Sequence, residues 1–285
     1  MAANFQNYIL QTGTALHETD DSFAFALGNW NSNGRPDLFI IKKSNTGTGS
    51  TEVSILSGDS NYQHYLLQTG TALHQTDHSF EFAVADWNKD GWQDLVIIKK
   101  SNTGTGSTEV SVLSGATNFR QYLLQTGTPL HQTDGNFSFA VADWTGDGRP
   151  DLFIIKKNNT GTGSTEVSIL SGSSNYQEYL LQTGTALHQT DDSFNFAVAD
   201  WNNDGWPDLI IVKKNNTGTG STEVSVLSGA TNFQHYLLQT GTPQHVTDHN
   251  YAFLASNWGG RGDCDLAVIK KNNTGTKSTE ISFMR

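Results

Sequence analysis

The sequence is poor in cysteine, with only Cys264 among 285 residues. A single cysteine excludes an intrachain disulfide and a zinc site built from several cysteines. Basic residues are also few, because 17 lysines and arginines stand against 28 aspartates and glutamates, and the formal net charge is −11. A chain this acidic lacks the positive surface that binds a phosphate backbone, so we expect no nucleic-acid partner.

Long apolar segments are missing as well. No stretch approaches the ~20 apolar residues that span a bilayer, so we expect no membrane insertion. The N-terminal segment has no basic region followed by an apolar core, which predicts a cytoplasmic or non-classically released protein. Hydrophobic residues nevertheless make up 35% of the chain and aromatic residues 11%. This composition is too apolar for a disordered chain.

The chain instead has a strict internal period. Its 285 residues are five times 57, and the tryptophans of five copies lie 57 residues apart, namely Trp30, Trp87, Trp144, Trp201 and Trp258. A fixed period of this length indicates repeated supersecondary units that need their neighbours. We therefore expect one domain, residues 1–285, made of the repeats 1–57, 58–114, 115–171, 172–228 and 229–285.

Each repeat reads as four short strands and no helix. In the second copy, residues 80–85 and 109–113 alternate apolar with smaller or polar side chains, as half-buried strands do. Residues 95–98 are all apolar, which suits a strand covered on both faces. Residues 65–68 indicate a fourth strand that is more exposed to solvent. The sequence thus predicts an all-β fold, with the repeated tryptophans packed in its core.

Five four-stranded units indicate a five-bladed β-propeller rather than a linear β-solenoid. The chain begins with a fourth-strand sequence, Tyr8-Ile-Leu-Gln-Thr, and stops after a third-strand sequence, Glu280-Ile-Ser-Phe. We therefore expect the N-terminal strand to close the last blade by pairing two edges that would otherwise be open.

The loop between the first two strands carries an oxygen-ligand pattern. In copy two it reads Asp86-x-Asn88-x-Asp90-Gly91 and closes with Asp94. Hard cations take oxygens from alternating positions around such a turn, so we predict structural Ca²⁺ sites in copies two to four. The remaining predicted ligands are Asp143, Asp147, Asp151, Asp200, Asn202, Asp204 and Asp208. Copy one is nearly neutral, and in copy five Arg261 occupies a ligand position. The alternative is that these side chains only cap turns.

Two segments carry a resemblance to a known family. They are Asp-Trp-Asn-x-Asp-Gly-x-x-Asp-Leu and Ile-Lys-Lys-x-Asn-Thr-Gly-Thr-Gly-Ser-Thr-Glu-Val. The first resembles the FG-GAP or integrin-like propeller repeat, and the whole unit is similar to repeats of the Psathyrella velutina lectin family. The resemblance covers essentially the full chain, although this chain has five units where that lectin has seven. It implies a lectin that binds N-acetylglucosamine-type or sialylated glycan ends.

A second polar set recurs on the loops of the opposite face. Sugar hydroxyls and acetamides need donors and acceptors at fixed positions, which aspartate, asparagine and neutral histidine supply together. The predicted carbohydrate-binding residues are His17, Asp20, Asn45, His74, Asp77, Asn102, His131, Asp134, Asn159, His188, Asp191, Asn216, His245, Asp248 and Asn273. The alternative is that the histidines cap the connections and the Asn-Thr-Gly segments are merely good turns.

Five equal copies of one His-x-x-Asp pair argue against catalysis, which needs a single asymmetric constellation. The sequence therefore predicts a multivalent lectin without enzymatic activity, monomeric and with glycan partners that end in N-acetylglucosamine. The competing interpretation is a propeller scaffold or protein-adhesion module, natural or engineered, without a sugar site.

Overall fold

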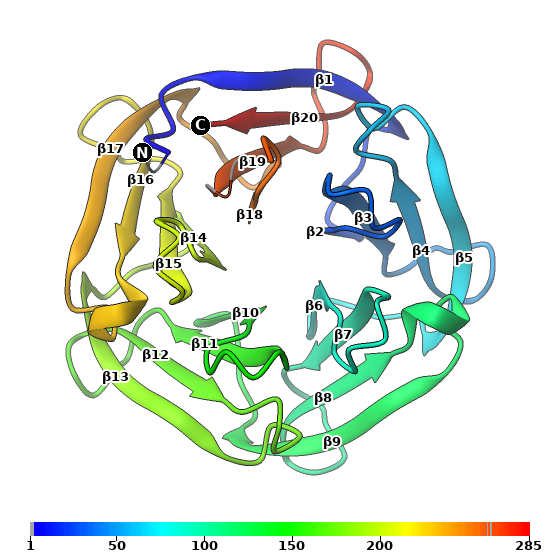
Figure 1. The fold of residues 1–285 in the computed structure, drawn as a ribbon, viewed down its shortest axis with the longest axis horizontal. Coiled ribbons are helices and arrows are strands. Elements are labelled where there is room, and N and C mark those ends of the chain that lie inside the picture. The colour runs from blue at the N-terminus through cyan, green and yellow to red at the C-terminus, as the bar shows by residue number, and fades with distance from the viewer. Residues whose placement is uncertain (1–2, 261, 263) are drawn as a thin grey trace. The chain divides into compact units, whose positions relative to one another are not determined.

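The computed structural model describes residues 3–260, 262 and 264–285. Within these residues the chain forms twenty strands in five antiparallel four-stranded sheets, and each sheet takes its strands in sequence order except the one that contains both ends of the chain (Figure 1). The fold is a five-bladed β-propeller of four-stranded blades, as the repeat length predicted.

Four of the sheets have the order of strands along the chain. Their bounds are β2 (Phe23–Gly28), β3 (Asp37–Lys42), β4 (Ser50–Leu56) and β5 (Tyr65–His74); β6 (Phe80–Ala85), β7 (Asp94–Lys99), β8 (Ser107–Leu113) and β9 (Tyr122–His131); β10 (Phe137–Ala142), β11 (Asp151–Lys156), β12 (Ser164–Leu170) and β13 (Tyr179–His188); and β14 (Phe194–Ala199), β15 (Asp208–Lys213), β16 (Ser221–Leu227) and β17 (Tyr236–His245). Short 3-10 turns, η1 (Gly115–Thr117) and η2 (Gly229–Thr231), follow β8 and β16.

The fifth sheet joins the two ends of the chain. It has the order β1-β20-β19-β18, with β1 (Tyr8–His17), β18 (Tyr251–Ser256), β19 (Asp265–Lys270) and β20 (Ser278–Met284). Strand β1 runs antiparallel to β20, and Gln11 lies opposite Ser282. Figure 1 shows this pairing as the blue strand alongside the red one. The predicted closure of the last blade by the N-terminal strand is confirmed.

The chain divides into two compact units. The terminal unit contains Met1–Thr19, Ile154–Ser168 and Gln182–Arg285, and the central unit contains Asp20–Phe153 and Ile169–Leu181. The terminal unit has a core that includes Phe253 and Trp201, and the central unit has one that includes Phe39 and Trp30. All five repeated tryptophans are at most 9% exposed, which confirms their predicted place in the core.

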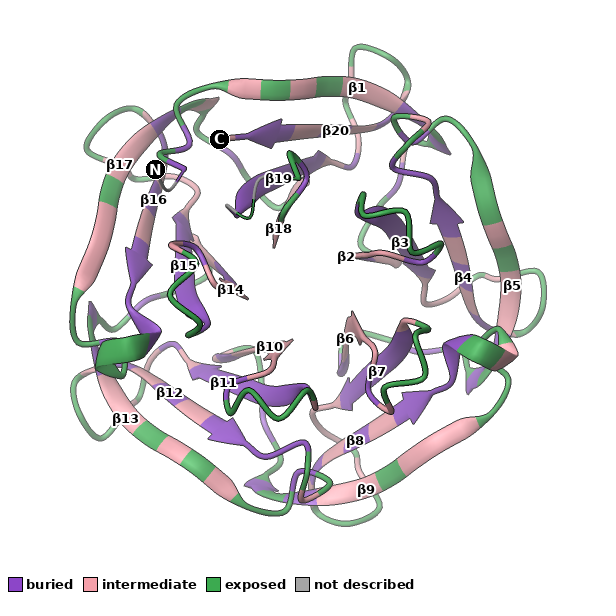
Figure 2. Ribbon diagram, in the orientation of Figure 1, coloured by how far each residue is buried: buried purple, intermediate pink, exposed green. Residues whose placement is uncertain are grey.

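The second strand of each sheet, counted in the order β6-β7-β8-β9, is buried on both faces. In β7 the side chains from Leu95 to Ile98 are at most 2% exposed, and the strand pairs with β6 on one edge and β8 on the other. Figure 2 shows the middle strands of the sheets largely buried, whereas the outer strands alternate between half-buried and exposed. The continuous apolar run in the sequence therefore identified the second strand of the sheet correctly.

The fourth strand is longer than the sequence suggested. It was expected at residues 65–68, but β5 extends to His74. Between Glu52 and Ser50 the pairing shifts at a bulge next to Gly70. Beyond it the strand resumes because Thr71 and Leu73 point inward while their neighbours are exposed. This alternation continues the half-buried pattern of a strand past the bulge.

The described residues contain no helix with the length and apolar character that crossing a membrane requires.

Candidate functional site

The last aspartate of the predicted cation loop faces inward. Asp94 is fully buried, and its two carboxylate oxygens accept hydrogen bonds from the backbone N–H groups of Trp87 (3.0 Å) and Gly115 (2.8 Å). Burial raises the pKa of this carboxyl group to about 6, and the nearby Asp90 and Asp86 add to the rise. Asp151 in the central unit and Asp208 in the terminal unit are buried in the same way. Each of these three carboxylates joins its own loop to the end of the third strand of the same sheet.

The other aspartates of these loops accept hydrogen bonds from the backbone of their own turn. The two oxygens of Asp86 accept the N–H groups of Asp90 (3.0 Å) and Gly91 (2.9 Å), and Asn88 donates to Asp90 (2.9 Å). The loops of the other two copies use their side chains similarly, with Asp143 accepting from Gly146 and Gly148, Asp147 from Arg149, Asp200 from Asp204 and Gly205, and Asn202 donating to Asp204.

This geometry suits the turn-capping alternative. Among residues 3–260, 262 and 264–285, no three histidine, cysteine, aspartate or glutamate side chains come together as a metal ion requires. Arg261, which we expected to replace a ligand in copy five, lies outside the described residues. Calcium in copies two to four stays a prediction.

The aspartates of the second predicted set begin tight turns. Each accepts a backbone N–H two residues later at 2.8 Å, as in the bond from Ser79 to Asp77. The same bond occurs at Asp20, Asp134, Asp191 and Asp248. The Ser79 hydroxyl also donates to Asp77 and is the main reason why the pKa of that carboxyl group is lowered.

The predicted histidines end the outer strands and are exposed. The ring of His74 meets Phe80 edge-on at 5.9 Å, and its backbone carbonyl accepts the Thr51 hydroxyl at 2.8 Å. His131 and His188 repeat both contacts. His17 and His245 repeat the bond to threonine. The histidines therefore lie on the strand, one step before the connection in which they were expected.

The predicted asparagines adopt a left-handed backbone. Their φ values are between 51° and 54°, at Asn45, Asn102, Asn159, Asn216 and Asn273. Asparagine tolerates this conformation better than most residues because its short polar side chain can bond locally. The conformation of the turn is thus sufficient to account for an asparagine at these positions.

A pocket of about 550 Å³ opens in the terminal unit between the entries to two innermost strands. Its lining comes from the turn before β14, the end of β15 and the turn before β18. The lining residues are Asp191, Asp192, Ser193, Lys214, Asn215, Asp248 and His249. Only Asp191 and Asp248 had been predicted as ligand-binding residues. The structure brings these two together, and leaves the predicted histidines and asparagines out of the lining.

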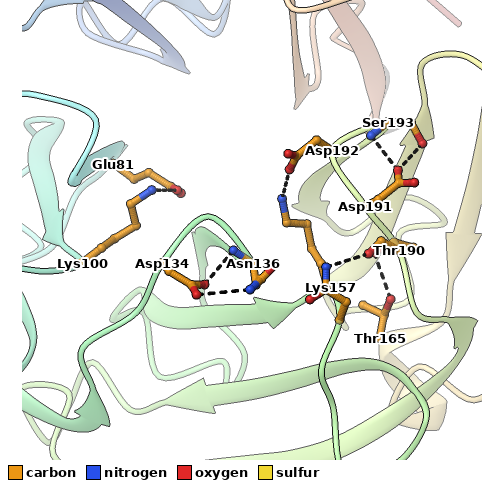
Figure 3. A network of polar contacts seen from close by, with 11 residues as sticks. Glu81, Lys100, Asp134, Asn136, Lys157, Thr165, Thr190, Asp191, Asp192 and Ser193 are labelled. Atoms are coloured by element: carbon orange, nitrogen blue, oxygen red, sulfur yellow. Dashed lines mark hydrogen bonds and ion pairs between the residues drawn. The ribbon is translucent and has the colours of Figure 1, made fainter.

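The carboxylates of this pocket are held by donors. Asp192 forms an ion pair with Lys157 at 2.7 Å, and Lys157 is buried while Asp192 is almost fully exposed (Figure 3). The hydroxyl and backbone N–H of Ser193 both bind Asp191 and lower the pKa of its carboxyl group. Asp191 is therefore ionised at neutral pH, and Asp192 presents its carboxyl group to the solvent side of the pocket.

Lys214 is the amine of the pocket. Burial lowers the pKa of its side chain, the charges of Lys157 and Lys271 lower it further, and Asp192 opposes the shift. Its neighbour Asn215 donates a hydrogen bond to the backbone carbonyl of Thr247 at 3.2 Å, which fixes the end of β15 against the turn before β18. The pocket thus combines fixed carboxylates with an amine that loses its proton more readily than a free lysine.

The lining of this pocket includes positions at which the copies differ. The position of Asp192 holds Asp21, His78, Gly135 and His249 in the other repeats. A second variable position lies on the innermost strands. There Glu81 in the central unit pairs with Lys100 at 3.0 Å (Figure 3) and accepts the Phe139 N–H at 3.1 Å, while the other copies have Ala24, Ser138, Asn195 and Ala252.

Sequence reasoning missed Asp192 and His249 because it looked for what the copies share. It passed over Lys214 although every copy has a lysine at this position. The signal that could have found Asp192 and His249 is their departure from the repeat.

Comparison with known proteins places the sequence in a family. The FG-GAP-like repeat matches three overlapping segments, residues 29–97, 86–154 and 143–211, which together span more than half of the chain. The chain belongs to the FG-GAP-like repeat family. The three matches begin in the Asp/Asn loops of successive copies, at residues 29, 86 and 143, so their spacing equals the 57-residue period. No curated protein matches this sequence.

Solved structures resemble this FG-GAP-like protein in fold. The α-L-arabinofuranosidase of Podospora anserina in complex with cellotriose has a TM-score of 0.61 at 10% identity, over 100% of this chain and 98% of that one. The catalytic domain of the Coprinopsis cinerea GH62 α-L-arabinofuranosidase has 0.57 at 10%, over 99% and 97%. The Xanthomonas citri GH43_1 enzyme complexed with xylose has 0.53 at 12%, over 96% and 89%. At such identities the likeness is one of fold.

These neighbours contradict two predictions from the sequence, a non-catalytic lectin or scaffold and the absence of enzymatic activity, because these three structures of similar fold are glycoside hydrolases. The physical error lies in the argument from equal copies. The copies carry different side chains at the turn position of Asp192 and at the strand position of Glu81, so they are not five equal sites.

Proposed function

We propose that this protein is a carbohydrate-active enzyme and that it hydrolyses a glycosidic bond in the pocket lined by Asp191, Asp192, Lys214, Asp248 and His249. The observation that carries the proposal is the gathering of three carboxylates, an amine of lowered pKa and an imidazole in one cavity. The fold supports the class of ligand, since relatives in fold were solved with xylose and with cellotriose.

Glycoside hydrolysis needs a group that protonates the leaving oxygen and a carboxylate that activates water or stabilises the positive sugar ring. Asp192 suits the second role, because its ion pair with the buried Lys157 holds the carboxyl group in place and its exposure lets it meet a ligand. Lys214 and His249 are the proton donors of the pocket. The lowered pKa of Lys214 brings its proton transfer closer to neutral pH than that of a free lysine.

The pocket also suits a sugar by size and polarity. Its volume of about 550 Å³ lies within the ~300–1,000 Å³ of small-molecule sites. Asn215 and Ser193 add an amide and a hydroxyl to its lining. Such groups donate and accept hydrogen bonds, and fit the mixed donors and acceptors of sugar hydroxyls.

The test is a hydrolysis screen of the full chain on aryl α-L-arabinofuranosides, β-xylosides, β-galactosides and β-N-acetylglucosaminides. We expect release of the aryl group from at least one, with kcat/KM falling at least ~100-fold in Asp192→Asn. The matched control is Asp21→Asn, which makes the same change at the same position of the first repeat. Failure of the wild-type protein on every glycoside would refute the proposal, and equal losses in both variants would refute the pocket assignment.

A further inference from the structure

A second cavity lies in the central unit on the last two strands of the sheet β2-β3-β4-β5. It has a volume of about 470 Å³ and is lined by Thr48, Glu52, Ser54, Gln68, Thr69 and Arg120, together with Gly70. Glu52 and Ser54 come from one face of β4, and Gln68 and Gly70 face them on β5. None of these residues belongs to the pocket at Asp192 or to the sites predicted from the sequence.

The cavity is shaped by a glycine. A Cβ atom at Gly70 would come within 2.8 Å of the Thr48 hydroxyl and 3.0 Å of the Ser50 hydroxyl, so the loop can lie this close to β5 only because residue 70 has no side chain. Thr48 is fixed in turn, since its backbone N–H donates to Glu52 Oε1 at 2.9 Å. The floor of the cavity is therefore rigid.

The lining is polar and carries both signs of charge. Arg120 donates to the Thr69 hydroxyl at 3.2 Å, and Glu52 faces the same cavity. A ligand with net charge would meet one like charge, whereas a neutral polyhydroxyl compound can donate to the carboxylate and accept from the guanidinium. Gln68 and the hydroxyl side chains supply further donors and acceptors.

We propose that this cavity is an accessory carbohydrate site that holds a neutral sugar unit of a glycan outside the pocket at Asp192. The choice of a glycan rests on the proposed function. The lining has no aromatic ring to cover the apolar face of a sugar, so the site binds weakly and acts by keeping a longer glycan at the protein surface.

The next repeat supplies an internal comparison. Its cavity, lined by Thr105, Glu109, Ser111, Gln125, Thr126 and Gly127, measures about 260 Å³. There Gln177 stands at the repeat position of Arg120 and donates to the Thr126 hydroxyl (3.0 Å) and the Gly127 carbonyl (2.7 Å). Because glutamine already occupies the equivalent position of the next repeat, Arg120→Gln removes the positive charge of the site with a side chain that this position accommodates.

The experiment records amide chemical shifts of the full-length Asp192→Asn variant during titration with cellotriose and, separately, β-1,3-galactotriose. We expect at least one of these neutral probes to shift Gly70 and Thr69. Arg120→Gln and Glu52→Gln should weaken the binding at least tenfold. Glu109→Gln is the matched control, because Glu109 makes the same bond to the Thr105 N–H at 2.9 Å, and it should leave the Gly70 shift unchanged.

Absence of a shift at Gly70 with both probes overturns the accessory site, as does a shift that survives Glu52→Gln. A trigalacturonate that binds more tightly than the neutral probes overturns the choice of a neutral ligand. These outcomes are independent of hydrolysis: a Gly70 shift without activity in the glycoside screen keeps this site and removes the proposed function, and activity without the shift does the reverse.

Discussion

The buried Asp94 gives the sharpest prediction for stability, through Asp94→Asn. In the folded protein its carboxylate accepts two backbone N–H groups, from Trp87 and Gly115, in a fully buried place. Asparagine has one acceptor oxygen, so one N–H must face the amide NH₂ instead. At acidic pH the aspartic acid is protonated, but its hydroxyl oxygen can still accept the second N–H, which the amide NH₂ cannot do. An unsatisfied buried donor costs about 1–3 kcal/mol, so the variant is less stable than wild type at acidic pH.

The size of the loss depends on pH. Burial raises the pKa of Asp94 to about 6, against ~3.9 in an unfolded chain. A raised pKa means that the folded state binds the proton more tightly, so this stabilisation is complete below about pH 4 and is lost as pH rises through 6. Two pKa units correspond to about 3 kcal/mol. Asparagine does not titrate, so the stability difference between wild type and variant should shrink by about 3 kcal/mol from pH 4 to pH 8.

The assay is urea unfolding followed by tryptophan fluorescence between pH 4 and 8, with the difference between the two proteins taken at each pH. Asp77→Asn provides a control for the sign. The Ser79 bonds lower the pKa of the exposed Asp77, so its stabilisation is present at neutral pH and lost in acid. A difference for Asp94→Asn that is independent of pH, or that grows as pH rises, would refute the reasoning.

Three further predictions concern stability. Gly115→Ala places a Cβ against the Gln93 carbonyl and should cost about 1–3 kcal/mol, whereas Gly104→Ala, whose Cβ finds no neighbour nearer than 3.7 Å, should be near neutral in urea unfolding. Arg285→Leu removes the partner of the buried Asp265, bonded at 2.9 and 3.1 Å, and should cost about 3–5 kcal/mol; a melting temperature equal to that of wild type would contradict this. Calcium in the loops of copies two to four would add ~2.7 kcal/mol per site at 100 times its Kd, so a chelator should lower the melting temperature. An unchanged melting temperature would mean that the loop carboxylates only cap turns.

The sequence predicted a strand correctly where the side chains of that strand alone carry the pattern. The apolar run at residues 95–98 predicted β7, the second strand of its sheet, because a strand covered on both faces has no polar side. The fourth strand was cut short at residue 68 because Gly70 interrupts the alternation, although the pattern resumes at Thr71. A bulge of this kind is defined by the partner strand, which a single segment does not contain.

The sequence by itself determined the period, the all-β class, the closure of the last blade and the acidic turns, since all of these depend on residues near one another in the chain or on exact repetition. The tertiary structure alone decided which side chains meet. Asp94, a predicted cation ligand, is fully buried, and its two oxygens accept hydrogen bonds from the backbone N–H groups of Trp87 and Gly115. Asp192, Lys214 and His249 come from different turns and meet only in the folded unit. The repeat makes the backbone of each turn the same, but the chemistry of a pocket depends on the few positions that differ and on which of them the fold brings together.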